Sequence, residues 1–162
     1  MATKHVLDQF RLDGKVALIT GGTRGLGFNM ATALGQVGAD IAIVGRSIEP
    51  ARQSAEALES ATGRKVRAFA GDVTSDADVR RLVAEVEREF GAVDVLVNSA
   101  GINIRGNADQ LSETDWDTVV DINLKGTFLC SRAAGPKMTS APLAASKVDW
   151  WHGHSSRCST LR

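Results

Sequence analysis

Residues 20–27 read TGGTRGLG, a glycine-rich turn that follows the apolar run VALI at 16–19 and precedes a stretch with helical spacing. A turn of this kind exposes backbone N–H groups to an anion, and the dipole of the following helix adds a favourable potential. Gly21 would permit the turn, Gly25 would let the backbone approach a ligand, and Gly27 would let the helix pack closely. Two interpretations stay open: a phosphate-binding loop, or a tight strand–helix turn without a ligand.

The sequence on either side alternates short apolar runs with helical patterns. The runs KVALIT, ADIAIVG, KVRAFA and VDVLVN are rich in β-branched residues and lie at 15–20, 39–45, 65–70 and 93–98. Three of them are nearly continuous, which is typical of parallel strands covered on both faces. Strand alternating with helix predicts an α/β fold with a right-handed parallel sheet. This context favours the phosphate-binding interpretation of the glycine turn.

Apolar periodicity predicts which helix faces are buried. A first helix would use Leu26, Met30, Leu34 and Val37; a later one would use Val79, Leu82, Val83, Val86 and Phe90. Ser75 and Ser112 each precede an aspartate by three residues, the spacing of a capping box at a helix start. The helix that begins near Ser112 has an apolar phase, expected to be buried, that consists of Trp116, Val119, Val120, Leu124 and Phe128.

Composition narrows the function classes. The chain has 162 residues, nineteen basic and nineteen acidic, so we expect one domain without a general attraction to nucleic acid or to an anionic membrane. No apolar run has the length of a signal sequence or a membrane span, which favours a cytoplasmic location. Cys130 and Cys158 lack the spacing of a metal site or a redox motif, and no metal is expected. The chain contains no tyrosine.

The end of the chain loses this regularity. Residues 137–162 contain no strand-like run and no sustained helical stripe. We therefore expect the ordered domain, which the glycine turn favours as a nucleotide-binding one, to cover 1–138, and an irregular tail to cover 139–162. A frameshift or an altered coding end near Met138 is one hypothesis for the change.

Four motifs, in order along about residues 12–138, resemble the short-chain dehydrogenase/reductase family of the classical type. They are TGxxxGxG at 20–27, GDV at 71–73, NSAG at 98–101 with Ser99 in place of an asparagine, and DINLKGTF at 121–128. The resemblance implies a Rossmann-like parallel sheet with helices on both faces, incomplete here, with its first four strands in the order 3-2-1-4. It also implies hydride transfer between a nicotinamide cofactor and a carbonyl or alcohol.

The resemblance also supplies the expected site residues. Asp72 and Val73 match the family's adenine-contacting pair. The cofactor-binding set is Gly21, Thr23, Arg24, Gly25, Leu26, Gly27, Arg46, Ser47, Asp72, Val73, Asn98, Ala100 and Gly101.

Charge argues for NADP(H) over NAD(H). An acidic residue near the end of the second strand usually holds the ribose 2′-hydroxyl and would repel a 2′-phosphate. Here that strand ends VGRS, without a carboxylate, and Arg46 and Arg24 could converge on one phosphate. The alternative is two solvated surface arginines, and Glu49 lies close enough in the sequence to compete.

The catalytic half of the resemblance is incomplete. Family members use a tyrosine and a lysine four residues later for proton transfer, and here Leu143 stands at the tyrosine position before Lys147. The segment ASK at 145–147 is either a remnant of that motif or a chance match. Asn123 corresponds to the family's relay asparagine, and its phase predicts a buried residue; it could equally be a hydrogen-bonded core group. His152 and His154 titrate in a useful range, but nothing in the pattern would position them.

The function expected is therefore an NADP(H)-dependent oxidoreductase lineage acting on a small carbonyl or alcohol, such as a 3-oxoacyl thioester or a sugar acid, with impaired catalysis in this chain. The alternative is a non-catalytic nucleotide-binding fragment or subunit. The resemblance implies a homo-oligomer, which the incomplete helices and an exposed fourth strand put in doubt.

Overall fold

The computed structural model describes residues 5–107 and 109–138, so the tail at 139–162, with Leu143 and Lys147, lies outside the described residues. Within this part of the chain the strands are β1 (Val16–Thr20), β2 (Asp40–Gly45), β3 (Val66–Ala70) and β4 (Val95–Asn98). The helices are η1 (Val6–Phe10), α1 (Gly25–Gln36), α2 (Ile48–Thr62), α3 (Asp76–Phe90), α4 (Glu113–Val120), the π-helical η2 (Asp121–Lys125) and α5 (Gly126–Met138).

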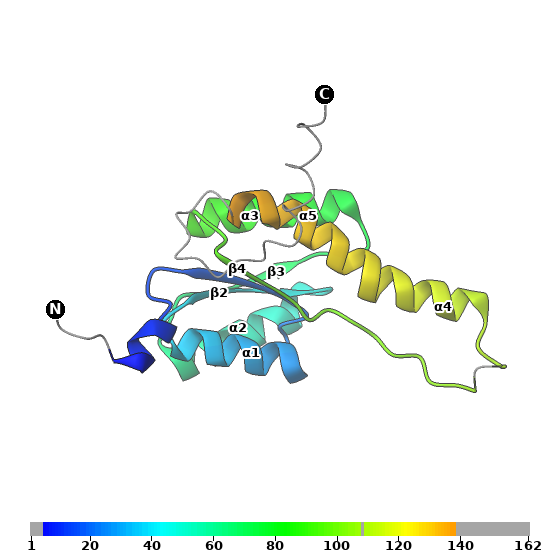
Figure 1. Ribbon diagram of the computed structural model, residues 1–162, viewed down its shortest axis with the longest axis horizontal. Coiled ribbons are helices and arrows are strands. Elements are labelled where there is room, and N and C mark those ends of the chain that lie inside the picture. The colour runs from blue at the N-terminus through cyan, green and yellow to red at the C-terminus, as the bar shows by residue number, and fades with distance from the viewer. Residues whose placement is uncertain (1–4, 108, 139–162) are drawn as a thin grey trace, which may run out of the picture.

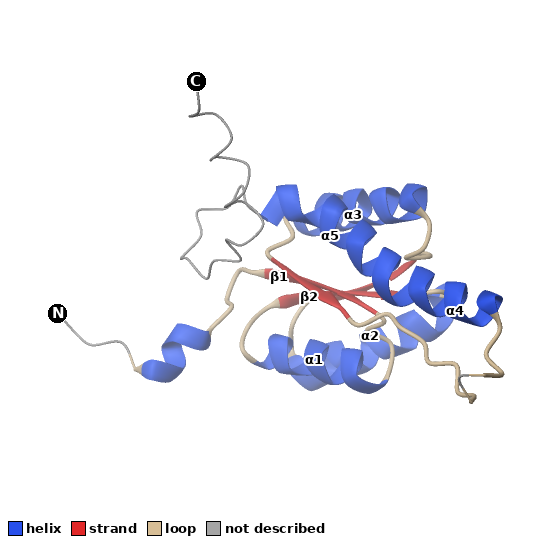
Figure 2. Ribbon diagram, turned by 45° about the vertical axis from the view of Figure 1, so that its right-hand side comes forward, coloured by secondary structure: helices blue, strands red, loops and turns tan. Residues whose placement is uncertain are grey.

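The strands form one parallel sheet in the order β3-β2-β1-β4, which confirms the predicted fold. Figure 1 shows α1 and α2 on one face and α3 and α5 on the other. Figure 2 shows the same layers from another side. In register, Thr20 lies opposite Val44 and Asn98, and Gly45 lies opposite Ala70. All four strands therefore end together, and the loops after them meet at one edge of the sheet.

Two core clusters explain why the strand sequences are nearly continuous apolar runs. Along β1, Ala17 and Ile19 enter the cluster that includes Leu58 of α2, whereas Leu18 enters the cluster that includes Leu82 of α3. All five residues of β1 are buried. A parallel strand covered by helices on both faces has no side that can carry polar residues.

The face that α1 buries differs from the prediction. Leu26 is 73% exposed and Met30 is 42% exposed, whereas Gly27, Ala31 and Gly35 are buried. A Cβ at Gly35 would lie 2.8 Å from the side chain of Thr62 in α2. The helix packs through its smallest residues because it lies very close to its neighbours. Leu26 and Met30 turn outward, whereas Phe28 and the predicted Leu34 are partly buried against the core.

The apolar phase predicted for the helix after Ser112 is also wrong. Trp116, Leu124 and Phe128 are 68%, 67% and 51% exposed. The buried residues are Gly126, Leu129, Cys130 and Ala134, all in α5. The π-helical turn of η2 rotates α5 relative to α4, so a single 3.6-residue period cannot describe both helices. Figure 1 shows the second reason: α4 extends beyond the sheet and has no core to cover.

Other local signals are confirmed. In α3, Val79, Leu82, Val83 and Val86 are buried, and Phe90 is partly buried against the core. Ser112 and Asp115 form the reciprocal capping box at the start of α4. No helix in the described ranges combines the length and apolar character that crossing a bilayer requires.

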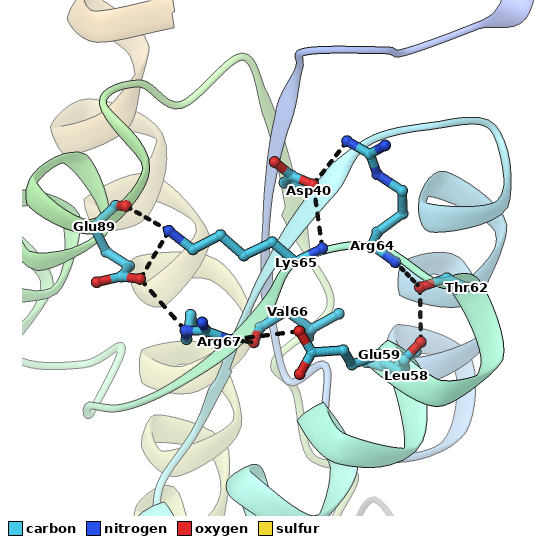
Figure 3. A network of polar contacts seen from close by, with 9 residues as sticks. All are labelled: Asp40, Leu58, Glu59, Thr62, Arg64, Lys65, Val66, Arg67 and Glu89. Atoms are coloured by element: carbon cyan, nitrogen blue, oxygen red, sulfur yellow. Dashed lines mark hydrogen bonds and ion pairs between the residues drawn. The ribbon is translucent and has the colours of Figure 1, made fainter.

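Polar contacts tie the amino ends of the strands together. Asp94 accepts hydrogen bonds from the backbone N–H of Val16 at 2.9 Å and from Lys15 at 2.8 Å. Asp40 of β2 accepts from Arg64 at 2.9 Å and from the N–H of Lys65 at 3.3 Å. Figure 3 shows this network continuing across β3, where Glu89 binds both Lys65 and Arg67.

Candidate functional site

A cleft of about 640 Å³ opens at the carboxyl ends of the four strands. The loops after β1, β2, β3 and β4 each contribute to its wall, and Thr118, Asp121 and Ile122 close it from the side of α4 and η2. In an open parallel sheet this edge is where ligands bind, because the loops and helix N-termini converge there. The cleft is therefore the candidate site.

The three glycines of the turn have different surroundings. Gly21 has a φ of 67°, and a Cβ there would lie 2.7 Å from the backbone oxygen of Ser99. A Cβ on Gly27 would overlap the carbonyl oxygen of Gly21. Gly25, with a φ of 57°, has nothing within 4 Å of the Cβ position, so its backbone faces open space in the cleft.

The start of α1 has free hydrogen-bonding capacity. The helix begins at Gly25, and its N-cap residue, Arg24, makes no side-chain capping hydrogen bond. The first N–H groups of a helix need a partner outside the helix. Their direction and the helix dipole make this point suitable for an anion.

Thr20 connects the glycine turn to the loop after β4, and sequence reasoning missed it. It is 1% exposed, and its Oγ1 accepts from the N–H groups of Ser99 at 3.2 Å and Ala100 at 3.3 Å. The same hydroxyl donates to the carbonyl of Val97 at 3.4 Å. The available signal was a threonine at the end of a fully buried strand, where a hydroxyl must find partners.

Arg24 and Arg46 both line the cleft, from the glycine turn and from the residue after β2. Both are exposed, and neither forms an ion pair with any residue in the described ranges. Glu49, the possible competitor, pairs instead with Arg52 at 2.9 Å and is not part of the cleft wall. The cleft wall therefore contains two guanidinium groups without an ion pair in the described ranges, one in the glycine turn and one directly after β2.

All the predicted cofactor-binding residues line the cleft except Ser47 and Asn98. Ser47 is the N-cap of α2 and makes no side-chain capping hydrogen bond. Asn98 donates to Ser131 of α5 at 3.2 Å. Ser47 therefore lies at the start of α2 and Asn98 between β4 and α5, and neither residue belongs to the wall of the cleft.

The loop after β3 has its own internal bonds. The Oδ1 atom of Asp72 accepts from the N–H of Thr74 at 2.9 Å and from its hydroxyl at 2.8 Å. Val73 is 9% exposed and packs with Val79 and Leu129. Hydrogen bonds on one side and apolar contacts on the other hold the loop against the cleft.

Asn123 is exposed, which corrects the expectation of a buried residue. Its side-chain amide makes a two-way contact with Ile102: Oδ1 accepts from the N–H at 2.9 Å, and Nδ2 donates to the carbonyl at 2.9 Å. Asn123 lies on the π turn of η2, whereas Ile102 lines the cleft. The contact thus fixes the loop after β4 to the long helical segment.

Cys130 is the cysteine in the described ranges, and it is buried. Burial raises the pKa of its thiol to about 11, so the group is protonated at neutral pH. It packs with Val73 and Leu129 as an apolar side chain.

Comparison with known proteins agrees with this architecture. The short chain dehydrogenase family matches residues 15–145, a match that continues past Met138 into the segment containing Leu143. D-threitol dehydrogenase of Mycolicibacterium smegmatis is 46% identical over 132 residues, which cover 82% of this chain and 50% of that protein. The 2-dehydro-3-deoxy-D-gluconate 5-dehydrogenase of Escherichia coli is 40% identical, over 80% of this chain and 50% of its own length.

A solved structure shows the same fold. The crystal structure of a gluconate 5-dehydrogenase from Burkholderia cenocepacia, in complex with NADP and tartrate, superposes with a TM-score of 0.76 at 39% identity, covering 82% of this chain and 51% of that one. This chain spans about half the length of the curated relatives that it matches. The parallel sheet, the glycine turn and these matches together show that the chain belongs to the short-chain dehydrogenase family.

Proposed function

We propose that this chain binds NADP(H) in the cleft at the carboxyl ends of its strands. The observation that carries the proposal is the pair Arg24 and Arg46, which line the cleft without an ion-pair partner in the described part of the chain. A guanidinium binds a phosphate with parallel, charge-assisted hydrogen bonds. The 2′-phosphate of the adenosine is the group that these two residues would hold.

The rest of the cleft fits a dinucleotide. The open space at Gly25 and the start of α1 would receive the pyrophosphate, because backbone N–H groups point there. Asp72 and Val73 would bind the adenine; Thr23, Leu26, Gly21, Gly27, Ala100 and Gly101 would form the remaining wall, with Ser47 and Asn98 beside it. Residues 1–138 form the cofactor-binding unit in this proposal, separate from 139–162.

The reaction class and substrate are also proposals. When bound, NADP(H) supplies or accepts the hydride at its nicotinamide ring. The relatives named above are dehydrogenases of a polyol and of sugar acids, which supports a small polyhydroxy alcohol or its carbonyl form as the substrate. We favour this substrate class over 3-oxoacyl thioesters because the names of these three relatives refer to a polyol or a sugar acid, and none refers to a thioester.

We further propose that the 162-residue polypeptide binds the cofactor with little or no turnover. The sequence has no tyrosine to move the proton that must accompany hydride transfer, and Leu143 cannot donate one. Asn123 fixes the loop at Ile102, and Lys147 would have no tyrosine to assist.

The test is a calorimetric titration of the wild-type chain and of Arg46→Ala with NADPH and, separately, with NADH. We expect the wild type to bind NADPH about tenfold more tightly than NADH, the size of one charge-assisted contact, and Arg46→Ala to lose that preference. Arg88→Ala, an exposed arginine near the end of α3, is the matched control and should keep the preference.

Two results would contradict the proposal. Equal or tighter binding of NADH by the wild type would overturn the assignment of the 2′-phosphate. Steady NADPH oxidation with sugar-acid or polyol-derived ketones would overturn the proposed lack of turnover.

A further inference from the structure

The start of α3 contains an incomplete capping box. Ser75 accepts from the N–H of Asp78 at 3.3 Å, as a capping serine should. In a full box the carboxylate of Asp78 would accept from the N–H of Ser75. Instead, Ser75 N–H donates to the carbonyl of Asp72 at 3.2 Å, and Asp78 Oδ2 accepts from the N–H of Asp72 at 3.1 Å.

A guanidinium anchors the redirected carboxylate. Arg81 donates to Asp78 Oδ1 at 3.2 Å and to the carbonyl of Ala70, the last residue of β3, at 3.1 Å. A third contact joins Arg81 to Glu85 at 3.1 Å, one turn further along α3. Arg81 therefore connects α3 to the end of β3. Asp78, which is bound to Arg81, connects both to the loop at Asp72.

The position of this pair relates it to the cleft. Asp78 and Arg81 line a hollow of about 290 Å³ beside the cleft, and Arg46, Gly71 and Asp72 line both spaces. The side chain of Asp72 is already fixed by Thr74, so the orientation of its backbone decides where its remaining oxygen points. Asp78 binds the N–H of that backbone from the hollow, outside the wall of the cleft.

We propose that Asp78, anchored by Arg81, is a positioning residue for recognition of the adenine ring. It sets the direction of the Asp72–Val73 segment without itself touching the nucleotide. The inference rests on the proposed binding of NADP(H) and adds a specificity role for this pair. Hydrogen bonding from the N–H of Asp72 and from Arg81 also holds the pKa of Asp78 below its usual range, so the carboxylate is charged at neutral pH.

The experiment compares NADPH with its hypoxanthine analogue, which carries an oxygen in place of the adenine amino group. Binding of both is measured by calorimetry on the wild type, Asp78→Ala, Asp78→Asn and Arg81→Met. The matched control is Asp40→Ala, because Asp40 also accepts from an arginine and from a backbone N–H, but at the opposite end of the sheet.

We expect the wild type to prefer the adenine form and Asp78→Ala to bind NADPH about fivefold more weakly, with the preference reduced towards unity. Asp78→Asn keeps an oxygen acceptor for the N–H of Asp72 and should retain most of the preference. Arg81→Met should shift both quantities in the same direction as Asp78→Ala, which keeps the test valid if that variant does not fold. Asp40→Ala should change neither.

A lower melting temperature for Asp78→Ala and Arg81→Met, with the base preference intact, would overturn the inference and reduce the pair to a helix cap. That result leaves the proposed function standing. Absence of NADPH binding by the folded wild type would overturn both.

Discussion

The two ends of the parallel strands are built from different chemistry. At the amino ends, Asp94 and Asp40 each accept hydrogen bonds from a basic side chain, Lys15 or Arg64, and from a backbone N–H. At the carboxyl ends, β1 leads into the glycine turn, and Arg24 and Arg46 line the cleft without an ion pair in the described ranges. The acidic side chains at the amino ends are paired with basic side chains of the same protein and hold the strands together. At the carboxyl ends, hydrogen-bond donors stay available to a ligand.

This difference is expected to divide stability from binding. Contacts at the amino ends join segments far apart in the chain, so they should contribute mainly to the free energy of unfolding. The donors at the carboxyl ends contribute little until an anion arrives. Variants at each end can therefore confirm or break the division.

The largest effect is expected for Gly27→Ala at the carboxyl end. Its new Cβ would overlap the backbone oxygen of Gly21, so the glycine turn must move. Overpacking of this kind costs about 1–3 kcal/mol, and we expect NADPH affinity to fall about a hundredfold because the N–H groups are displaced. Calorimetry and urea unfolding measure the two quantities.

The control for this substitution is Gly135→Ala in α5, where nothing lies within 4 Å of the Cβ position. Alanine suits a helix interior better than glycine, but the ring of Pro136 disfavours a helical residue with a Cβ before it, so we expect the free energy of unfolding to change by less than about 1 kcal/mol in either direction and NADPH affinity to stay unchanged. If Gly27→Ala bound NADPH like the wild type, the glycine turn would not be the pyrophosphate site.

An intermediate effect is expected for Asp94→Ala at the amino end. The Asp94 side chain is only 12% exposed, and its loss leaves the N–H of Val16 without its partner. An unsatisfied buried donor costs about 1–3 kcal/mol of unfolding free energy. NADPH affinity should stay unchanged at temperatures where the variant is folded, while Asp94→Asn should recover part of the stability.

A fall in NADPH affinity for folded Asp94→Ala as large as that for Gly27→Ala would break the division between the two ends. Urea unfolding followed by circular dichroism gives the stability, and calorimetry on the same preparations gives the affinity.

The smallest effect is expected for Glu89→Gln. The hydrogen bond from Lys65, followed by the charges of Lys65 and Arg67, holds the pKa of Glu89 below its usual range. The folded state therefore binds this proton less readily than the unfolded state, so the contribution is present at neutral pH and is lost as the pH falls through the folded-state pKa. Urea unfolding from neutral to acidic pH should show the wild type and variant converging in acid; a constant difference would argue against this ion pair.

Sequence patterns predicted the buried residues well where an element lies against the core along its whole length. The nearly continuous runs at β1 and β2 could be recognised because both faces of these strands are covered, and the stripe at Val79–Val86 because α3 lies flat on the sheet. The same reasoning was wrong for Leu26 and Trp116. In α1, close packing selects small residues, and α4 lies beyond the sheet, so apolar periodicity did not coincide with burial.

The candidate site could be predicted in part for a similar reason. The glycine turn and Arg46 follow directly from their positions after strands, so short motifs were sufficient. The hydrogen bonds that Thr20 accepts from Ala100 and Asp78 accepts from Asp72 were missed. Neither partner can be identified from spacing alone.

The succession of strands and helices along the chain, the glycine turn and the VGRS end of β2 can be recognised from the amino-acid sequence, because each depends on neighbouring residues. The contacts of Asp94 with Val16 and of Asn123 with Ile102, in contrast, could be identified only from the three-dimensional arrangement of the chain. Parallel strands joined by crossing helices bring distant segments together at the strand ends. Polar groups there find partners according to position in space, and no local pattern encodes that choice.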